Sequence, residues 1–221
     1  MRPHVIGYSG YREETGMRTR QREPLSTNAV VIFGLNSTIR VDGGDLGTFV
    51  GGLSDTAPVV EHDGVMSGIQ VDLTPLGARM LFGVPMHELA RRSVALEDVI
   101  GVEARRLEER LHDAATWDER FAIVEDALAR RLESATPPPP DVTYAWNRLA
   151  ETQGRERVEA LAQSIGSSRK HLAARFREHV GLPPKLVTRT MRFRRAIDLL
   201  TSLDPPPLDE LAFTCGYYDQ S

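Results

Sequence analysis

The chain has 221 residues, 41% of them apolar and 26% charged, with a formal net charge of −4 and a single cysteine. The apolar fraction excludes intrinsic disorder as the main state, one thiol excludes an internal disulfide, and no apolar run is long enough to span a membrane. Because the first residues also lack the apolar stretch of a signal peptide, we expect a soluble, cytoplasmic protein with no membrane partner.

Residues 30–73 have the pattern of an all-β unit. Eight of the 18 glycines fall in this range, and they separate short segments that are rich in β-branched residues. We predict five strands, at Val30–Leu35, Thr38–Gly43, Gly47–Leu53, Pro58–Gly64 and Ser67–Leu73. Regular short strands joined by tight turns predict a small sandwich or barrel.

From Thr74 onward the periodicity is that of helices. Thr74 followed by Pro75 has the pattern of an N-cap with proline at the first helical position. Apolar residues recur at helical spacing over 102–115, and Thr116 to Glu119 has capping-box spacing before a further helix. We expect helices at about 75–133, and the pair at 102–133 is a candidate dimer contact; the alternative is that this pair packs against its own barrel.

A run of four prolines, Pro137 to Pro140, interrupts the helical pattern. Proline cannot donate a backbone hydrogen bond and favours extended, semi-rigid spacers. We therefore interpret residues 136–141 as a linker between a domain at 1–135 and a second domain at 142–221. The alternative is an ordinary helix end within one domain.

The charge balance changes sign across these prolines. Residues 1–141 hold 15 Lys and Arg against 22 Asp and Glu, whereas residues 142–221 hold 12 against 9. The stretch from Arg155 to Arg195 contains 11 basic and three acidic residues, which is typical of a phosphate-binding surface. The alternative is a solvated, arginine-rich helical face, since only two of the basic residues are lysines.

Residues 158–180 have the pattern of a helix, a glycine turn at Gly166 and a second helix capped by Ser168, which is the helix-turn-helix arrangement. In that motif the N-terminal residues of the second helix enter the major groove. With Leu172 and Phe176 packed inward, we predict DNA contacts from Ser168, Arg169, Lys170, Ala173, Ala174 and Arg177. A generic helical hairpin is the alternative.

Residues 161–200 resemble the first helix-turn-helix and linker helix of AraC/XylS-type transcriptional regulators. The matching positions are Leu161-Ala162, Ser168, Leu172, Phe176, Gly181, Pro184, Arg192, Ala196 and Leu199-Leu200. Residues 208–221 resemble the start of the second motif of that family, with its Cys-Gly-Tyr-x-Asp-Gln-Ser signature at Cys215 to Ser221.

The resemblance implies an α+β protein with an N-terminal cupin-like β-barrel and helical hairpin, followed by an all-α double helix-turn-helix domain. It implies a sequence-specific, DNA-binding transcriptional regulator whose N-terminal domain senses an effector, dimerises or does both. The partners it implies are double-stranded DNA, a small-molecule effector, a second copy of the chain and RNA polymerase. The sequence does not identify the effector.

The chain departs from the family pattern at two places. It stops at Ser221, inside the first turn of the second recognition helix, so we expect an incomplete second motif whose DNA-contacting residues here are Gln220 and Ser221. Ala173 and Ala174 stand where the family often has polar base-reading side chains. Base specificity should therefore rest mainly on Arg169 and Lys170.

We find no pattern for a catalytic, metal or cofactor site. The six histidines are scattered, and His62, the one in a predicted strand, has neighbours that point to opposite faces. Cys215 has an apolar setting that favours a core residue over a nucleophile. We therefore expect no enzyme; the alternatives are a cupin-type enzyme that uses the barrel and a truncated dimerisation partner that does not bind DNA.

Overall fold

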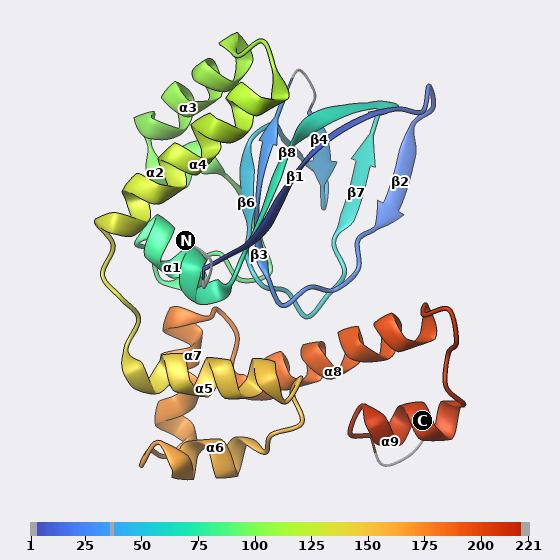
Figure 1. Ribbon diagram of the computed structural model, residues 1–221, viewed down its shortest axis with the longest axis vertical. Coiled ribbons are helices and arrows are strands. Elements are labelled where there is room, and N and C mark those ends of the chain that lie inside the picture. Colours follow the sequence, from blue (N-terminus) through green and yellow to red (C-terminus); the bar gives the residue numbers. More distant parts are fainter. Residues whose placement is uncertain (1–3, 36–37, 218–221) are drawn as a thin grey trace.

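The computed structural model describes residues 4–35 and 38–217, and its N-terminal half is built on two β-sheets (Figure 1). The five-stranded sheet has the order β1 (Val5–Glu14), β8 (Val65–Leu73), β3 (Ala29–Gly34), β6 (Phe49–Gly51) and β9 (Ser93–Ala95). The four-stranded sheet has the order β2 (Thr19–Arg22), β7 (Val59–His62), β4 (Ile39–Val41) and β5 (Gly44–Leu46). Neighbouring strands are antiparallel throughout these sheets.

The closed barrel that we expected is not what forms, because no strand pairing in the described part of the chain joins the two sheets. Each sheet has an edge strand of only three residues, β9 in one and β5 in the other. Within the described residues these edge strands pair on one side only, so each hydrogen-bond ladder ends at them and the sheets stay open. The two sheets face each other as open layers.

Side-chain alternation along β3 divides the core of the N-terminal half. Ala29, Val31 and Phe33 join the main core under the helices, while Ile32 points the other way into a smaller cluster with Phe49 and residues of β4. This follows from the period of two along a strand. The space between the sheets is therefore lined partly by apolar side chains.

The expected helices follow the sheets. α1 (Pro75–Phe82) begins at the predicted cap, where Thr74 Oγ1 accepts a 3.0 Å hydrogen bond from the backbone N–H of Gly77. The capping box at the start of α4 (Trp117–Glu133) is also confirmed, with Thr116 and Glu119 accepting hydrogen bonds from each other's backbone N–H groups. The remaining elements are η1 (Met86–Glu88), α2 (Leu96–Ile100) and α3 (Val102–Asp113).

The α3–α4 pair packs against its own sheet. Trp117 and Phe121 lie over Gly10 of β1, and a Cβ atom at Gly10 would come within 2.7 Å of the Trp117 ring. The rings of Phe121 and Tyr8 are 5.6 Å apart. This contact supports the second of the two interpretations of the pair, while its role in a dimer stays a prediction.

The C-terminal half consists of helices. They are α5 (Pro140–Glu151), α6 (Val158–Ser164), α7 (Arg169–His179), α8 (Pro184–Leu200) and α9 (Leu208–Thr214). Prolines stand at or just before the first residue of α5, α8 and α9, as their missing N–H allows. The segment 136–141 that we expected as a linker therefore overlaps the first turn of α5.

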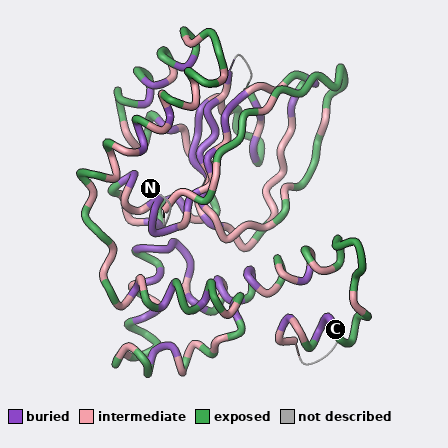
Figure 2. The backbone as a smooth tube through the Cα atoms, viewed as in Figure 1, coloured by how far each residue is buried: buried purple, intermediate pink, exposed green. Residues whose placement is uncertain are grey.

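The two halves share one continuous hydrophobic core, whose buried segments run from the five-stranded sheet through α1 into α5 and α7 (Figure 2). At the junction α7 packs against α1 and η1, and Gly181 with φ +101° brings its backbone to the Met86 carbonyl. Asp55 adds a polar link, accepting from Arg91 at 2.6 Å and from Arg189 of α8 at 2.9 Å. The hydrogen bond from Arg91 lowers the pKa of Asp55, and Arg189 acts in the same direction.

His179, at the end of α7, is buried in this junction, and its Nδ1 has no hydrogen-bond partner. Burial lowers the pKa of His179, and the guanidinium groups of Arg79 and Arg175 add to this lowering, whereas Glu178 opposes it.

No helix in the described part of the chain combines the length and apolarity that crossing a membrane requires.

Candidate nucleic-acid interface

The turn between α6 and α7 is built from two local signals. Gly166 adopts φ +63°, a left-handed conformation that costs glycine little, and the N–H of Ser167 donates to the Ala162 carbonyl at 2.9 Å. Ser168 then caps α7, because its Oγ accepts a 3.1 Å hydrogen bond from the N–H of His171. The expected helix-turn-helix unit is formed.

The inner face of α7 holds the unit together. Leu172 and Phe176 are at most 1% exposed, and they pack with Leu161 and Ala162 of α6 and with the buried face of α5. Burying two large apolar side chains at i and i+4 fixes the rotation of α7 about its axis. The opposite face must then point to solvent.

The outer face of α7 carries the residues that we predicted to contact DNA. Arg169, Lys170, Ala174 and Arg177 are exposed, and Ala173 is partly buried. They follow helical spacing along one face over two turns. Ser168 is exposed at the head of the helix, with its oxygen used in the cap. Gln220 and Ser221 lie outside the described residues.

Two neighbours of this face were missed in the sequence. Glu159 of α6 accepts a 2.8 Å hydrogen bond from Arg169, and hydrogen bonds from its own backbone N–H and from Arg169 lower the pKa of Glu159. Lys185, the second residue of α8, lines the same groove as Lys170. The basic stretch had included Lys185, but no local pattern connected it with α7.

The start of the second motif packs onto the end of α8. Leu211, Ala212 and Cys215 are buried, and Leu211 and Cys215 form a small cluster with Ala196. Arg192 Nη1 donates to the Gly216 carbonyl at 3.0 Å, and its guanidinium lies over the Tyr217 ring. Cys215 is a core residue here, and burial raises the pKa of its thiol.

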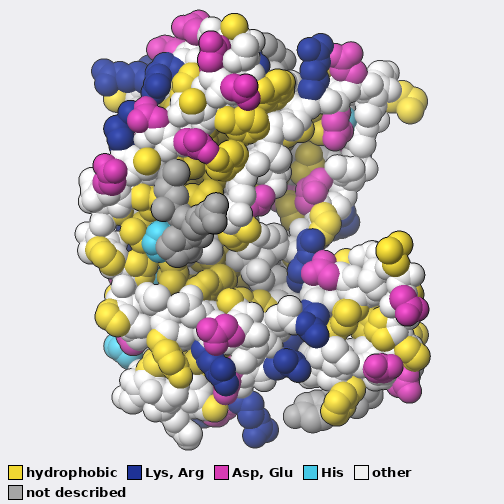
Figure 3. All heavy atoms as spheres, viewed as in Figure 1, with side chains coloured by type: hydrophobic (Ala, Val, Ile, Leu, Met, Phe, Trp, Pro, Cys, Tyr) yellow, Lys and Arg dark blue, Asp and Glu magenta, His cyan; other side chains and the backbone are white. Residues whose placement is uncertain are grey.

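The family comparison agrees with this geometry. Residues 161–221 match the family model described as a helix-turn-helix domain. These residues form an AraC-type helix-turn-helix domain. Figure 3 shows Lys and Arg side chains along the lower half of this face, where the C-terminal helices lie in Figure 1.

Solved structures resemble the chain over nearly its whole length. ToxT from Vibrio cholerae strain SCE256, in a structure with an unsaturated fatty acid bound, has a TM-score of 0.50 at 9% identity, covering 100% of this chain and 90% of that chain. A second ToxT structure has a TM-score of 0.47 at 10% identity, covering 97% and 90%.

The AraC-like transcriptional activator CuxR has a TM-score of 0.26 at 16% identity, covering 88% of this chain and 80% of that chain. No curated protein sequence matched the chain. At these identities the likeness to ToxT concerns the fold alone.

A cavity of about 780 Å³ lies between the two sheets of the N-terminal half, and its lining extends to the AraC-type domain. Its apolar wall includes Ile32 and Phe49, and Arg91 and Arg92 line it as well. Arg194 of α8 also lines this cavity, so a helix of the AraC-type domain forms part of its wall.

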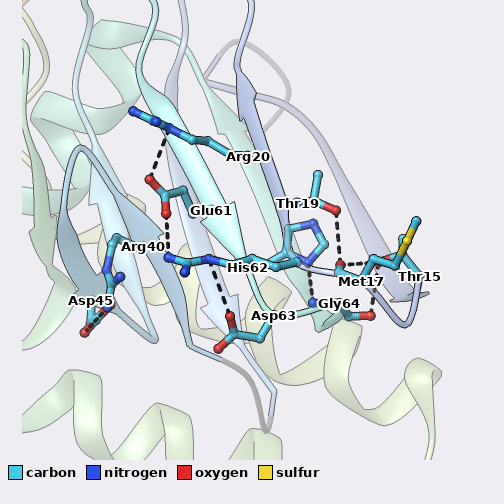
Figure 4. A network of polar contacts seen from close by, with 11 residues as sticks. Thr15, Met17, Thr19, Arg20, Arg40, Asp45, Glu61, His62, Asp63 and Gly64 are labelled. Carbon is cyan, nitrogen blue, oxygen red and sulfur yellow. Dashed lines mark hydrogen bonds and ion pairs between the residues drawn. The ribbon is translucent and has the colours of Figure 1, made fainter.

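The polar residues around β7 do not form a metal site. His62 is buried, and its Nδ1 accepts a hydrogen bond from the N–H of Gly64, while Glu61 and Asp63 pair with Arg18 (Figure 4). Within 4–35 and 38–217, no group of three or more His, Cys, Asp or Glu side chains is placed to hold a metal ion.

Proposed function

We propose that this protein is a transcriptional regulator that binds DNA through α7 and a small-molecule effector through the cavity between its sheets. The observation that carries the proposal is the outer face of α7. It presents Arg169 and Lys170 to solvent in the first turn and Arg177 about two turns further along, on a helix whose rotation is fixed by Leu172 and Phe176. Basic side chains on such a face supply phosphate contacts and bidentate contacts to guanine.

The test is fluorescence anisotropy with a mixed-sequence DNA duplex at a low and a higher salt concentration. We expect the parent chain to bind at low salt and to weaken as salt rises, because counterions are released on binding. The triple variant Arg169→Ala/Lys170→Ala/Arg177→Ala should lose most of this affinity. The control Arg106→Ala removes one exposed positive charge from α3, which lies outside the AraC-type domain, and should bind like the parent.

The competing hypothesis of a dimerisation partner that does not bind DNA predicts no binding even at low salt. That result would contradict the proposed function. Equal loss in the triple variant and in Arg106→Ala would contradict the assignment of the interface to α7, because both would then reflect charge alone.

The effector part of the proposal is supported by the lining of the cavity. Apolar side chains from both sheets suit an apolar body, and Arg92 and Arg194 suit an anionic group. The ToxT structure with a bound unsaturated fatty acid gives one such ligand as a probe. We expect an unsaturated fatty acid to raise the melting temperature of the parent chain. The rise should be smaller in the variant Ile32→Trp, because the larger side chain occupies part of the cavity. An unchanged melting temperature in the parent would contradict this part alone.

A further inference from the structure

A groove of about 540 Å³ lies where α6, the first turns of α7 and the start of α8 meet. We propose that this groove, here called the lysine groove, binds a phosphate of the DNA backbone, held between Lys170 and Lys185. The proposal rests on the proposed function, since it names the part of the DNA that this face contacts. It also assigns different roles to the basic residues: the two lysines contact phosphate, and Arg169 reads bases.

The charges in the lysine groove favour an anion. Lys170 and Lys185 are the only lysines among 27 basic residues, and both are exposed on its walls. Among the described residues, neither ammonium group has a hydrogen bond or ion pair. The one carboxylate in the lining, Glu159, is paired with Arg169 at 2.8 Å. The two ammonium charges are therefore left uncompensated.

The dipoles of α7 and α8 disfavour a positive charge at the start of each helix, so the two lysines are unfavourable there without an anion. α7 and α8 have no acidic residue in their first turn, where the helix dipole favours negative charge. Each instead carries a lysine as its second residue. A bound phosphodiester would offset both unfavourable placements, and a compact ammonium group suits a phosphate oxygen as a point charge.

The shape of the groove leaves room for a backbone. Ala173 contributes only a methyl group to its wall, and Pro184 is buried and holds the start of α8 in place. A long side chain at position 173 would fill the space between the lysines. The small residue that departs from the family pattern thus opens the site.

The ion pair between Glu159 and Arg169 distinguishes Arg169 from Lys170. The Arg169 guanidinium pairs with Glu159 at 2.8 Å, so its charge is partly compensated before DNA binds, whereas the two lysines have no such partner in the described residues; both members of this pair are exposed, so the pairing is weak. Lys170 should then contribute affinity rather than sequence preference. This revises our expectation that Lys170 reads bases.

The first experiment measures the salt dependence of binding to a mixed-sequence duplex. Removing one contact with a phosphate reduces the slope of log K against log salt by about 0.9. We expect this reduction in Lys185→Gln and in Lys170→Gln, but not in Lys185→Arg or in the control Arg106→Gln. A parent slope retained by Lys185→Gln would overturn the groove while leaving the proposed function standing. No binding by the parent would contradict both.

The second experiment uses the fact that the chain has only these two lysines. Amine acetylation, read by mass spectrometry, should be slowed at Lys170 and Lys185 by the duplex but not by inorganic phosphate at the same ionic strength. Unslowed acetylation of Lys185 with saturating duplex would overturn the proposal. Equal protection by inorganic phosphate would also overturn it, because the groove would then be a site for small anions only.

Discussion

The cap of α7 offers a substitution pair that separates folding from DNA binding. Ser168→Ala removes the oxygen that accepts from the His171 N–H, and no other acceptor replaces it except water. Loss of an N-cap hydrogen bond costs about 1 kcal/mol, within a range of roughly 0.5–2. Because Ser168 is exposed, water recovers part of the loss, so we expect the lower half of that range. For a chain of this length, 1 kcal/mol corresponds to a change in melting temperature of roughly 2–4 °C.

Ser168→Asp is the matched variant. Aspartate keeps an acceptor at the cap and interacts favourably with the helix dipole, so the melting temperature should stay at or above that of the parent. The added negative charge would face the DNA backbone, so DNA affinity should fall well below that of Ser168→Ala. Melting by circular dichroism and anisotropy with a DNA duplex measure the two quantities. Equal DNA affinity of the two variants would refute the placement of this helix end at the DNA.

Three further outcomes follow from the structure. Gly52→Ala would bring a Cβ atom to 2.1 Å from the Leu89 carbonyl oxygen, so the free energy of unfolding in urea should fall by about 1–3 kcal/mol; an unchanged urea midpoint would contradict the contact. Because the fold lowers the pKa of His179, the unfolded chain takes up its proton first, near pH 6.5, and stability should fall as pH drops from 7 to below that value. His179→Gln should flatten this dependence, and an equally steep profile in the variant would assign it to other groups. Cys215 is fully buried with a raised thiol pKa, so a disulfide reagent should modify it slowly in the folded chain and fast in urea; equal rates would show it accessible.

The sequence predicted best those elements that are set by local chemistry. Thr74 with Pro75, Thr116 with Glu119, and Gly166 with Ser168 each define a helix start or turn through bonds within a few residues, and all three form as expected. The central strands, separated by glycine turns, were predicted for the same reason.

Elements that depend on distant partners were missed. β1 (Val5–Glu14) is an edge strand with mostly exposed residues, so it has no clear alternation, and it forms by pairing with β8. β9 has three residues, too few for a pattern. The expected barrel failed for a related reason, because the short edge strands that leave the sheets open give no signal of where pairing stops.

The candidate site also has one part that local sequence patterns predict and another that depends on distant residues. Its exposed face on α7 follows from the inward packing of Leu172 and Phe176, which helical spacing indicates. The approach of Lys185 to Lys170 depends on how α8 folds back after Pro183-Pro184, and the contact of Asp55 with Arg189 joins residues 134 apart. Such contacts belong to the tertiary fold and have no local pattern.

Selection from a pool of randomised DNA duplexes tests most directly the claim that α7 reads sequence. We predict that the parent chain and the control Arg106→Ala enrich the same motif, and that Arg169→Ala relaxes the preference at one position of that motif while keeping the others. Failure of the parent to enrich any sequence at low salt, or an unchanged motif in Arg169→Ala, would contradict the account.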